Sequence, residues 1–195
     1  AKISDSVTSI GSYAFVWTGL TSIDIPDSVT YVGDYAFSYC RSAKSLVIGD
    51  SLKTVGSSAF YNCILLESVK FGDSFDTLSS SIFSGCSSLK EIELPDVITN
   101  IPSYAFCGCS SLEGISFPDS VVAIDEYAFS GCSSIKEIEL PNVITNIPSH
   151  AFYGCSSLGK ISFSDSVTTF GEYAFGGCHI LKDINIPEGI TTLKK

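Results

Sequence analysis

The chain has 195 residues, of which 45% are hydrophobic and 16% are charged, and its formal net charge is −10 at pH 7. This composition is too apolar for a disordered chain, and the negative charge argues against binding to nucleic-acid phosphates or to anionic lipid. No run of about 18 apolar residues predicts a membrane span and no secretory leader is visible, although residues 1–8 already resemble the second half of a repeat unit.

Eight phenylalanines divide the chain into units of nearly constant length. The first interval between them is 22 residues and the other six are 23. A fixed period in this range predicts a solenoid, in which each unit packs only against its neighbours. The marking residues are Phe15, Phe37, Phe60, Phe83, Phe106, Phe129, Phe152 and Phe175.

Each unit contains one short strand followed by a return segment. Residues 91–94 alternate polar and apolar, which predicts a half-buried strand. Pro95 ends this strand because proline cannot donate to a ladder, and Asp96 suits the turn that follows. Residues 103–106 then return the chain as a turn or a single helical turn. Alanine precedes the phenylalanine in seven of eight units, with Ile82 as the exception, which indicates close approach of neighbouring coils.

The apolar positions of successive units form columns that only stacking can bury. Strands that stack at ~4.8 Å would give, over seven steps, a parallel sheet roughly 34 Å long. We therefore predict an α/β repeat solenoid over residues 1–195, with about eight 23-residue repeats and incomplete repeats at both ends. One parallel sheet of short strands would form one side, and turns or short helical turns would form the opposite side.

The repeat resembles that of BspA-like leucine-rich repeat proteins, which are related to treponemal leucine-rich repeats. Residues 20–40 match the family's unit, L-x-x-I-x-I-P-x-S-V-T-x-I-G-x-x-A-F-x-x-C, almost throughout. The resemblance covers the whole chain and implies a right-handed leucine-rich-repeat coil. It also implies a surface-exposed or secreted protein of bacteria or protists that takes part in adhesion, including binding of host matrix proteins.

Eight cysteines suggest a disulfide framework at first sight, but their spacing argues otherwise. Seven of them occupy one equivalent position per unit, where neighbouring Cβ vectors would be parallel instead of converging. We interpret this column as buried thiols that act as small hydrophobes; a metal ladder or disulfides are the alternative. Cys107 lies outside the column and is the one thiol expected to be accessible.

No catalytic constellation is found, so we predict that the chain is not an enzyme and needs no cofactor or metal. His150 occupies a column of tyrosines and is interpreted as a tyrosine substitute, and a Cys178–His179 nucleophile pair is the weaker alternative. The chain contains no P-loop, G-x-S-x-G, H-E-x-x-H or N-x-S/T pattern.

The variable positions beside each strand's central residue point away from the core, onto the open face of the sheet. Four glutamates fall on alternate rungs of this face, with a rung of small residues between them. One interpretation is a solvated face that keeps the sheet soluble; the other is an acidic patch for a basic protein segment, which we favour over Ca²⁺. The candidate ligand-binding residues are Asp24, Lys70, Glu91, Glu93, Ser116, Glu137, Glu139, Lys160 and Asp183.

A second period of 46 residues indicates duplication of a two-unit block. The segments that begin at Phe83 and Phe129 are near twins, as are those that begin at Cys109 and Cys155. An array that grows in this way favours extended length over a unique pocket. We therefore expect a non-enzymatic, adhesin-type solenoid at the cell surface or outside the cell, with a host extracellular-matrix protein or another surface protein as ligand. The alternative is a structural protein whose uncapped ends self-associate head-to-tail into filaments or a surface layer.

Overall fold

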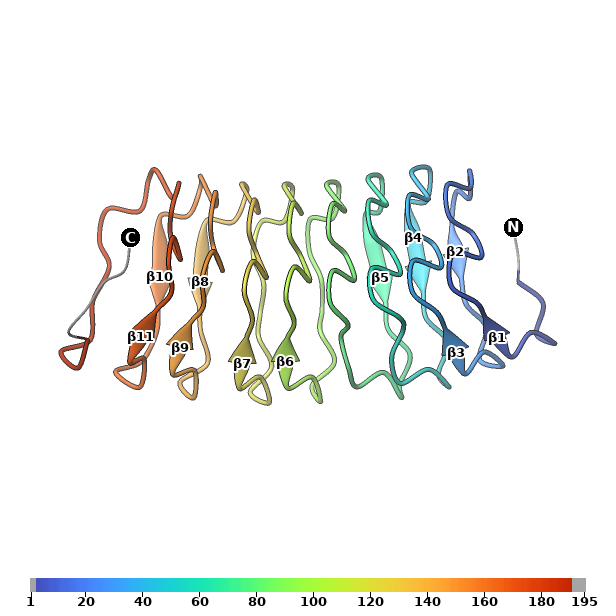
Figure 1. The fold of residues 1–195 in the computed structure, drawn as a ribbon, viewed down its shortest axis with the longest axis horizontal. Coiled ribbons are helices and arrows are strands. Elements are labelled where there is room, and N and C mark those ends of the chain that lie inside the picture. Colours follow the sequence, from blue (N-terminus) through green and yellow to red (C-terminus); the bar gives the residue numbers. More distant parts are fainter. Residues whose placement is uncertain (1–2, 191–195) are drawn as a thin grey trace.

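The computed structural model describes residues 3–190 and shows a row of stacked coils (Figure 1). The predicted parallel solenoid of short strands is confirmed. Turns fill the segments around the phenylalanines, and no helix occurs among residues 3–190. Most coils contribute one or two short strands, and every observed pairing between strands is parallel.

The strands lie along two sides of the solenoid (Figure 1). The side that we call the strand face carries a three-stranded sheet in the order β2-β4-β5 and a two-stranded sheet of β8 and β10. Its strands are β2 (Ile23–Asp24), β4 (Ser45–Val47), β5 (Ser68–Lys70), β8 (Glu137–Glu139) and β10 (Lys160–Ser162). The back face carries the pairs β1-β3, β6-β7 and β9-β11. Its strands are β1 (Ser9–Ile10), β3 (Tyr31–Val32), β6 (Asn100–Ile101), β7 (Ala123–Ile124), β9 (Asn146–Ile147) and β11 (Thr169–Phe170).

The continuous sheet expected on the strand face is interrupted, which corrects the sequence-based prediction. Residues 91–94 and 114–117, at the fourth and fifth rungs, form no strand. Glutamate and glycine are both depleted in strands, and Gly114 has no side chain to pack on its neighbours. Glu137 in β8 differs from Glu91 because Lys160 of β10 lies directly opposite it in the ladder.

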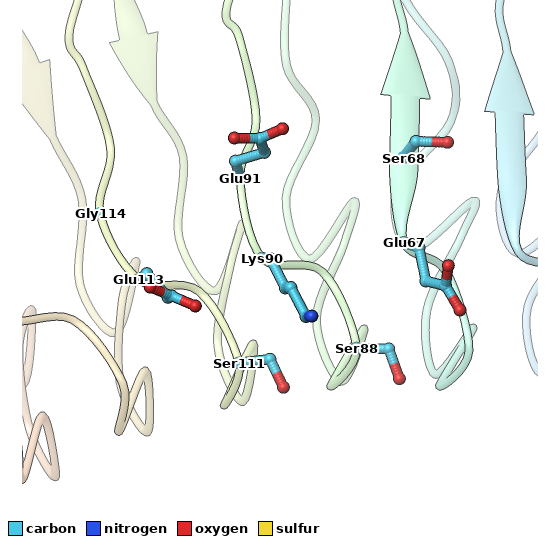
Figure 2. Close-up of a pocket in the computed structure, with 8 residues that line it drawn as sticks. All are labelled: Glu67, Ser68, Ser88, Lys90, Glu91, Ser111, Glu113 and Gly114. Atoms are coloured by element: carbon cyan, nitrogen blue, oxygen red, sulfur yellow. The ribbon is translucent and has the colours of Figure 1, made fainter.

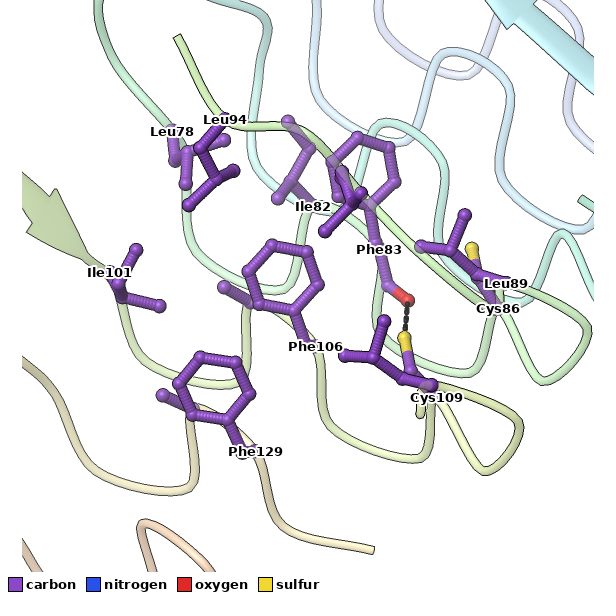
Figure 3. Close-up of a cluster of buried hydrophobic side chains, with 14 of the residues drawn as sticks. Leu78, Ile82, Phe83, Cys86, Leu89, Leu94, Ile101, Phe106, Cys109 and Phe129 are labelled. Atoms are coloured by element: carbon purple, nitrogen blue, oxygen red, sulfur yellow. Dashed lines mark hydrogen bonds between the residues drawn. The ribbon is translucent and has the colours of Figure 1, made fainter. Parts of the chain in front are cut away.

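The eight phenylalanines form one column through the centre of the solenoid. Successive ring centroids are 5.0–5.8 Å apart, with nearly parallel planes. The six inner rings are fully buried, whereas Phe15 and Phe175 in the outer coils are half-buried. Figure 3 shows Phe83, Phe106 and Phe129 stacked in this way. The column confirms that equivalent positions of successive units meet.

Neighbouring coils are joined by a backbone hydrogen bond beside this column. The amide of each phenylalanine donates to the carbonyl of the residue that precedes the next phenylalanine, as in Phe83 to Ala105 at 2.9 Å. Seven such bonds, 2.7–3.2 Å long, link all eight coils. Five of the alanines at this position are completely buried, which confirms the close approach that the repeated alanine predicts.

The turn around each phenylalanine places two residues in the left-handed region. The positions two before and two after the phenylalanine both have positive φ, as in Tyr104 at 60° and Gly108 at 74°. An L-residue in this region carries a steric cost that glycine avoids. Glycine fills the second position in the last five units, at 85, 108, 131, 154 and 177.

The cysteine column lies directly beside the phenylalanine column and is hydrogen-bonded. Each thiol donates to the carbonyl of the phenylalanine in the preceding coil, with Sγ–O distances of 3.1–3.3 Å. Figure 3 shows this contact between Cys109 and Phe83. The same carbonyl also accepts the amide of Cys86 in its own coil. All eight cysteines are free thiols, and six of the seven in the column are fully buried.

Burial changes the acidity of these thiols. The pKa of Cys86 and that of Cys155 are both raised to about 12, and the pKa of the half-buried Cys178 is raised to about 11. In each case the main cause is loss of water around the thiolate, which disfavours the charged form. The pKa values of Cys109 and Cys132 are raised for the same reason. These five thiols are therefore protonated over the whole physiological range.

The central phenylalanine should contribute strongly to stability. We expect Phe106→Ala to lower the free energy of unfolding by about 3–5 kcal/mol, because it leaves a cavity between two stacked rings. Tyr104→Ala in the same coil is the control, since that exposed side chain loses only its stacking on Tyr127, about 0.5–1.5 kcal/mol. Urea unfolding measures both losses, and equal losses would contradict a core centred on the phenylalanine column.

The cysteine column should make the fold sensitive to alkaline pH. In the unfolded chain a thiol ionises near pH 8.5, whereas the folded chain holds Cys86 protonated to about pH 12. The folded state then binds more protons, so stability is fully present below about pH 8.5 and falls as the pH rises toward 12. Each such thiol lowers the free energy of unfolding by about 1.4 kcal/mol per pH unit in this window.

The double variant Cys86→Ser/Cys109→Ser tests this dependence, because serine does not titrate and Thr18 already places a hydroxyl in this column. We expect the variant to lose stability with pH less steeply than the parent chain, by about 2–3 kcal/mol per pH unit. Urea unfolding at pH 7, 9, 10 and 11 gives the two slopes. Identical slopes would show that these thiols do not govern the alkaline transition.

Candidate functional site

The structure places all nine predicted ligand-binding residues on the strand face with exposed side chains. In each three-residue strand the central residue faces the core and its two neighbours face solvent, as in Glu137 and Glu139 around the buried Ile138. Asp24, Lys70 and Lys160 also lie in strands. The others stand at rungs that form no strand: Glu91, Glu93, Ser116 and Asp183.

The strand face is hollowed near its middle by two neighbouring grooves. One has a volume of about 970 Å³ and is lined by Glu67, Ser68, Ser88, Lys90, Glu91, Ser111, Glu113 and Gly114. Figure 2 shows Lys90 between Glu67 and Glu113, with Glu91 farther along the same coil. The other groove, of about 1020 Å³, includes Ser116, Glu137, Glu139 and Lys160 in its lining. The two grooves share Glu113 and Gly114, so they meet at the fifth rung.

A third, smaller hollow of about 580 Å³ lies over the first coils. Asp24 and Lys70 line it together with Asp5, Asp27 and Asp50. Of the nine predicted residues, seven therefore line a hollow of the strand face, while Glu93 and Asp183 line none of these three.

A column of alternating charge borders the grooves and is absent from the set predicted from the sequence. At 23-residue intervals it reads Lys44, Glu67, Lys90, Glu113 and Lys136. Two ion pairs form within it, from Lys44 to Glu67 at 3.9 Å and from Lys136 to Glu113 at 3.5 Å. The regular spacing of opposite charges was the available sequence signal. Both pairs are exposed, and such pairs contribute little stability, so the column mainly sets the charge at the groove's edge.

The four glutamates of the predicted patch take part in no ion pair among residues 3–190. Lys160 stands opposite Glu137 and Ser162 stands opposite Glu139 in the paired strands. Glu91 and Glu93 face the rung of Gly114 and Ser116 on one side. The face is thus acidic around its two grooves, and the carboxylates of these four glutamates, unlike those of Glu67 and Glu113, can bind a cationic group without breaking an ion pair of the described residues.

The other residues considered as candidates, His150, Cys178 and Cys107, pack within the solenoid and form no catalytic site among residues 3–190. His150 stacks on Tyr127 with a centroid distance of 4.4 Å and lies 5.2 Å from Tyr173, which confirms that it replaces a tyrosine. Cys178 is half-buried and donates to the Phe152 carbonyl. Cys107 is also half-buried, and burial raises its pKa, so it is less accessible and less acidic than a free surface thiol.

Among residues 3–190 no group of three or more His, Cys, Asp or Glu side chains is arranged to hold a metal ion. Within the same range no helix has the length and apolar character needed to cross a bilayer.

Comparisons of sequence and of structure both identify the repeat as a leucine-rich repeat. A family model described as "BspA type Leucine rich repeat region (6 copies)" matches residues 8–113 and 99–195. The crystal structure of a Treponema pallidum leucine-rich repeat protein is similar at 26% identity with a TM-score of 0.80, covering 90% of this chain and 83% of that one. No protein of curated function matches the sequence.

Two further solved structures show the same fold. A leucine-rich repeat protein from Bacteroides ovatus is 29% identical with a TM-score of 0.63, covering 96% of this chain and 66% of that chain. A leucine rich cell surface protein from Faecalibacterium prausnitzii is 27% identical with a TM-score of 0.61, covering 95% and 72%. Similarity thus extends over nearly the whole chain in proteins that share the coil but few identical residues.

Proposed function

Because the chain belongs to the BspA-type leucine-rich repeat family, we propose that it is a non-enzymatic binding solenoid that recognises a protein ligand with its strand face. Solenoids of this kind are generally protein-interaction modules, since stacked repeats present an extended surface instead of an enclosed pocket. In this proposal residues 1–195 act as one solenoid, without a catalytic centre or a cofactor.

The acidic strand face is the observation that carries the proposal. Glu91, Glu137 and Glu139 are exposed and line two adjoining grooves, and Glu93 is exposed two residues from Glu91. None of the four forms an ion pair among the described residues. A basic segment of a protein is the ligand that complements this charge. Ca²⁺ fits less well, because carboxylates on separate rungs do not form the compact oxygen shell that this ion requires.

The location that suits this function is the cell surface or the extracellular space. The Faecalibacterium prausnitzii relative is described as a cell surface protein, and a net charge of −10 favours a soluble, repelling surface over association with anionic lipid. We infer an adhesin-type role, with a host extracellular-matrix protein or another surface protein as the ligand.

Removal of the four carboxylates should abolish this binding. The variant Glu91→Gln/Glu93→Gln/Glu137→Gln/Glu139→Gln is compared with the parent chain by surface plasmon resonance on a panel of purified extracellular-matrix proteins. For the matrix protein that binds the parent chain, we expect at least tenfold weaker binding, equivalent to about 1.4 kcal/mol. Binding to the parent chain should also weaken as salt rises from 50 to 300 mM, because exposed charges are screened.

A matched control distinguishes loss of the binding site from a general effect of the altered net charge. Glu126→Gln/Glu172→Gln removes two exposed carboxylates of the turn segments and is compared with Glu137→Gln/Glu139→Gln, which has the same net charge. Only the second pair should weaken binding. Equal affinity in all variants would reject the strand face as the binding surface, and sedimentation of each protein at several concentrations shows whether head-to-tail association contributes to the signal.

A further inference from the structure

The fifth rung of the strand face is an open notch at the point where the two grooves meet. Gly114 is the one glycine in its column, in which the other units carry Ser22, Ser45, Ser68, Glu91, Glu137, Lys160 and Asp183. A Cβ atom placed on Gly114 would meet no other atom within 4 Å, and its φ is not in the left-handed region. The space above this residue is therefore open, and a side chain added there would meet no steric clash at its Cβ atom.

The floor of the notch is apolar. Ile115 and Phe117 are both half-buried, whereas Ile92 and Ile138, the residues equivalent to Ile115 in the two neighbouring units, are buried. Phe117 rests edge-on against Phe129, with ring centroids 5.7 Å apart, so the floor is fixed to the core. A ligand side chain with an aliphatic stem would cover the exposed apolar surface of Ile115 and Phe117. In the adjoining units the protein's own side chains already cover the equivalent surface.

The walls of the notch are acidic. Glu91 and Glu93 stand one rung before it, Glu137 and Glu139 stand one rung after it, and each rung is ~4.8 Å from the next. A cationic group on the fifth rung would lie within reach of carboxylates on both sides.

The duplicated block of the same chain shows which group suits this position. The 46-residue repeat aligns Gly114 with Lys160, in segments that differ at two adjacent positions: Cys109-Ser-Ser-Leu-Glu-Gly-Ile-Ser-Phe and Cys155-Ser-Ser-Leu-Gly-Lys-Ile-Ser-Phe. The other difference is Glu113 in place of Gly159. Lys160 stands opposite Glu137, and the two strands pair as β8 and β10. Around Gly114 no strand forms. The second block thus carries its own cation at the rung that the first block leaves open.

We propose that the notch formed by Gly114, Ile115, Ser116 and Phe117 receives an arginine side chain of the protein ligand, between the glutamates of the adjoining rungs. This inference rests on the proposed function and names the group that the strand face recognises. Arginine fits better than lysine because its planar guanidinium binds two carboxylates through several donors at once. Its aliphatic stem would lie on Ile115 and Phe117.

The decisive variant is Gly114→Lys, which makes the first block resemble the second. The probe is the peptide acetyl-Gly-Arg-Gly-amide, titrated into ¹⁵N-labelled parent chain at millimolar concentration and followed by NMR. We expect the amide signals of residues 114–117 to shift with the arginine peptide. At least threefold smaller shifts are expected with the lysine peptide and none with the uncharged citrulline peptide. In Gly114→Lys these shifts should disappear.

Ser22→Lys is the matched control, because it adds the same charge in the same column but four rungs away. It should leave the shifts at residues 114–117 unchanged, and the thermal unfolding of both lysine variants shows whether each is folded. If Gly114→Lys does not fold, Glu91→Gln/Glu137→Gln takes its place and should reduce the shifts at least tenfold.

The outcomes distinguish this inference from the proposed function. Absence of shifts at residues 114–117, or equal shifts with the arginine and lysine peptides, would overturn the arginine site. If the fourfold glutamine variant loses its matrix ligand while Gly114→Lys retains it, the strand face binds protein but the notch is not the site. Loss of that ligand in Gly114→Lys, with retention in Ser22→Lys, supports both.

Discussion

The hydrogen bond between the turns of neighbouring coils is the interaction on which the rest of the structure depends. It runs from each phenylalanine amide to the residue before the next phenylalanine and is present at all seven coil-to-coil steps. The strand pairings, in contrast, form at some steps and not at others. Since a buried amide must find a partner, this contact fixes the register of the coils even where Gly114 and Glu91 leave the strand face unpaired.

Because the turn hydrogen bonds, and not the strand pairings, hold the coils in register, the residues of the strand face can vary while the coil remains the same. The similar solved structures share only 26–29% of their residues with this chain, yet the coil of the Treponema pallidum protein superposes with a TM-score of 0.80. The register is held by backbone atoms at the turn and by small or apolar side chains such as Ala105 and Phe106, which are completely buried. The outward residues of the strands contribute little to that register, so they can vary while the coil is kept.

The columns of the core could be predicted from the sequence because each depends on one residue type that returns at a fixed interval. Phe106, Cys109 and Ala105 are buried as their spacing indicates, and His150 stacks among tyrosines as its column indicates. The strands of the back face, such as β6, were not predicted, because two-residue ladders leave no pattern of alternation that differs from a turn.

The interrupted sheet and the grooves could not be predicted in this way, because they depend on differences between units. Whether a rung pairs is decided by which side chains face each other, as Lys160 faces Glu137 while Gly114 faces Glu91. A search for repeated residues averages out such differences. The exposure of the candidate ligand-binding residues could be predicted from the alternation of side chains along a strand. The notch at Gly114 could be recognised only from the shape of the surface in the structure.

The hydrogen-bonded thiol column has a consequence for where the protein can fold. Its cysteines are satisfied one by one, each by a carbonyl of the coil before it, and none needs a partner thiol. Formation of this column therefore requires no oxidant, no disulfide isomerase and no choice among competing disulfide pairings. The coil can therefore adopt the same structure in a reducing and in an oxidising environment.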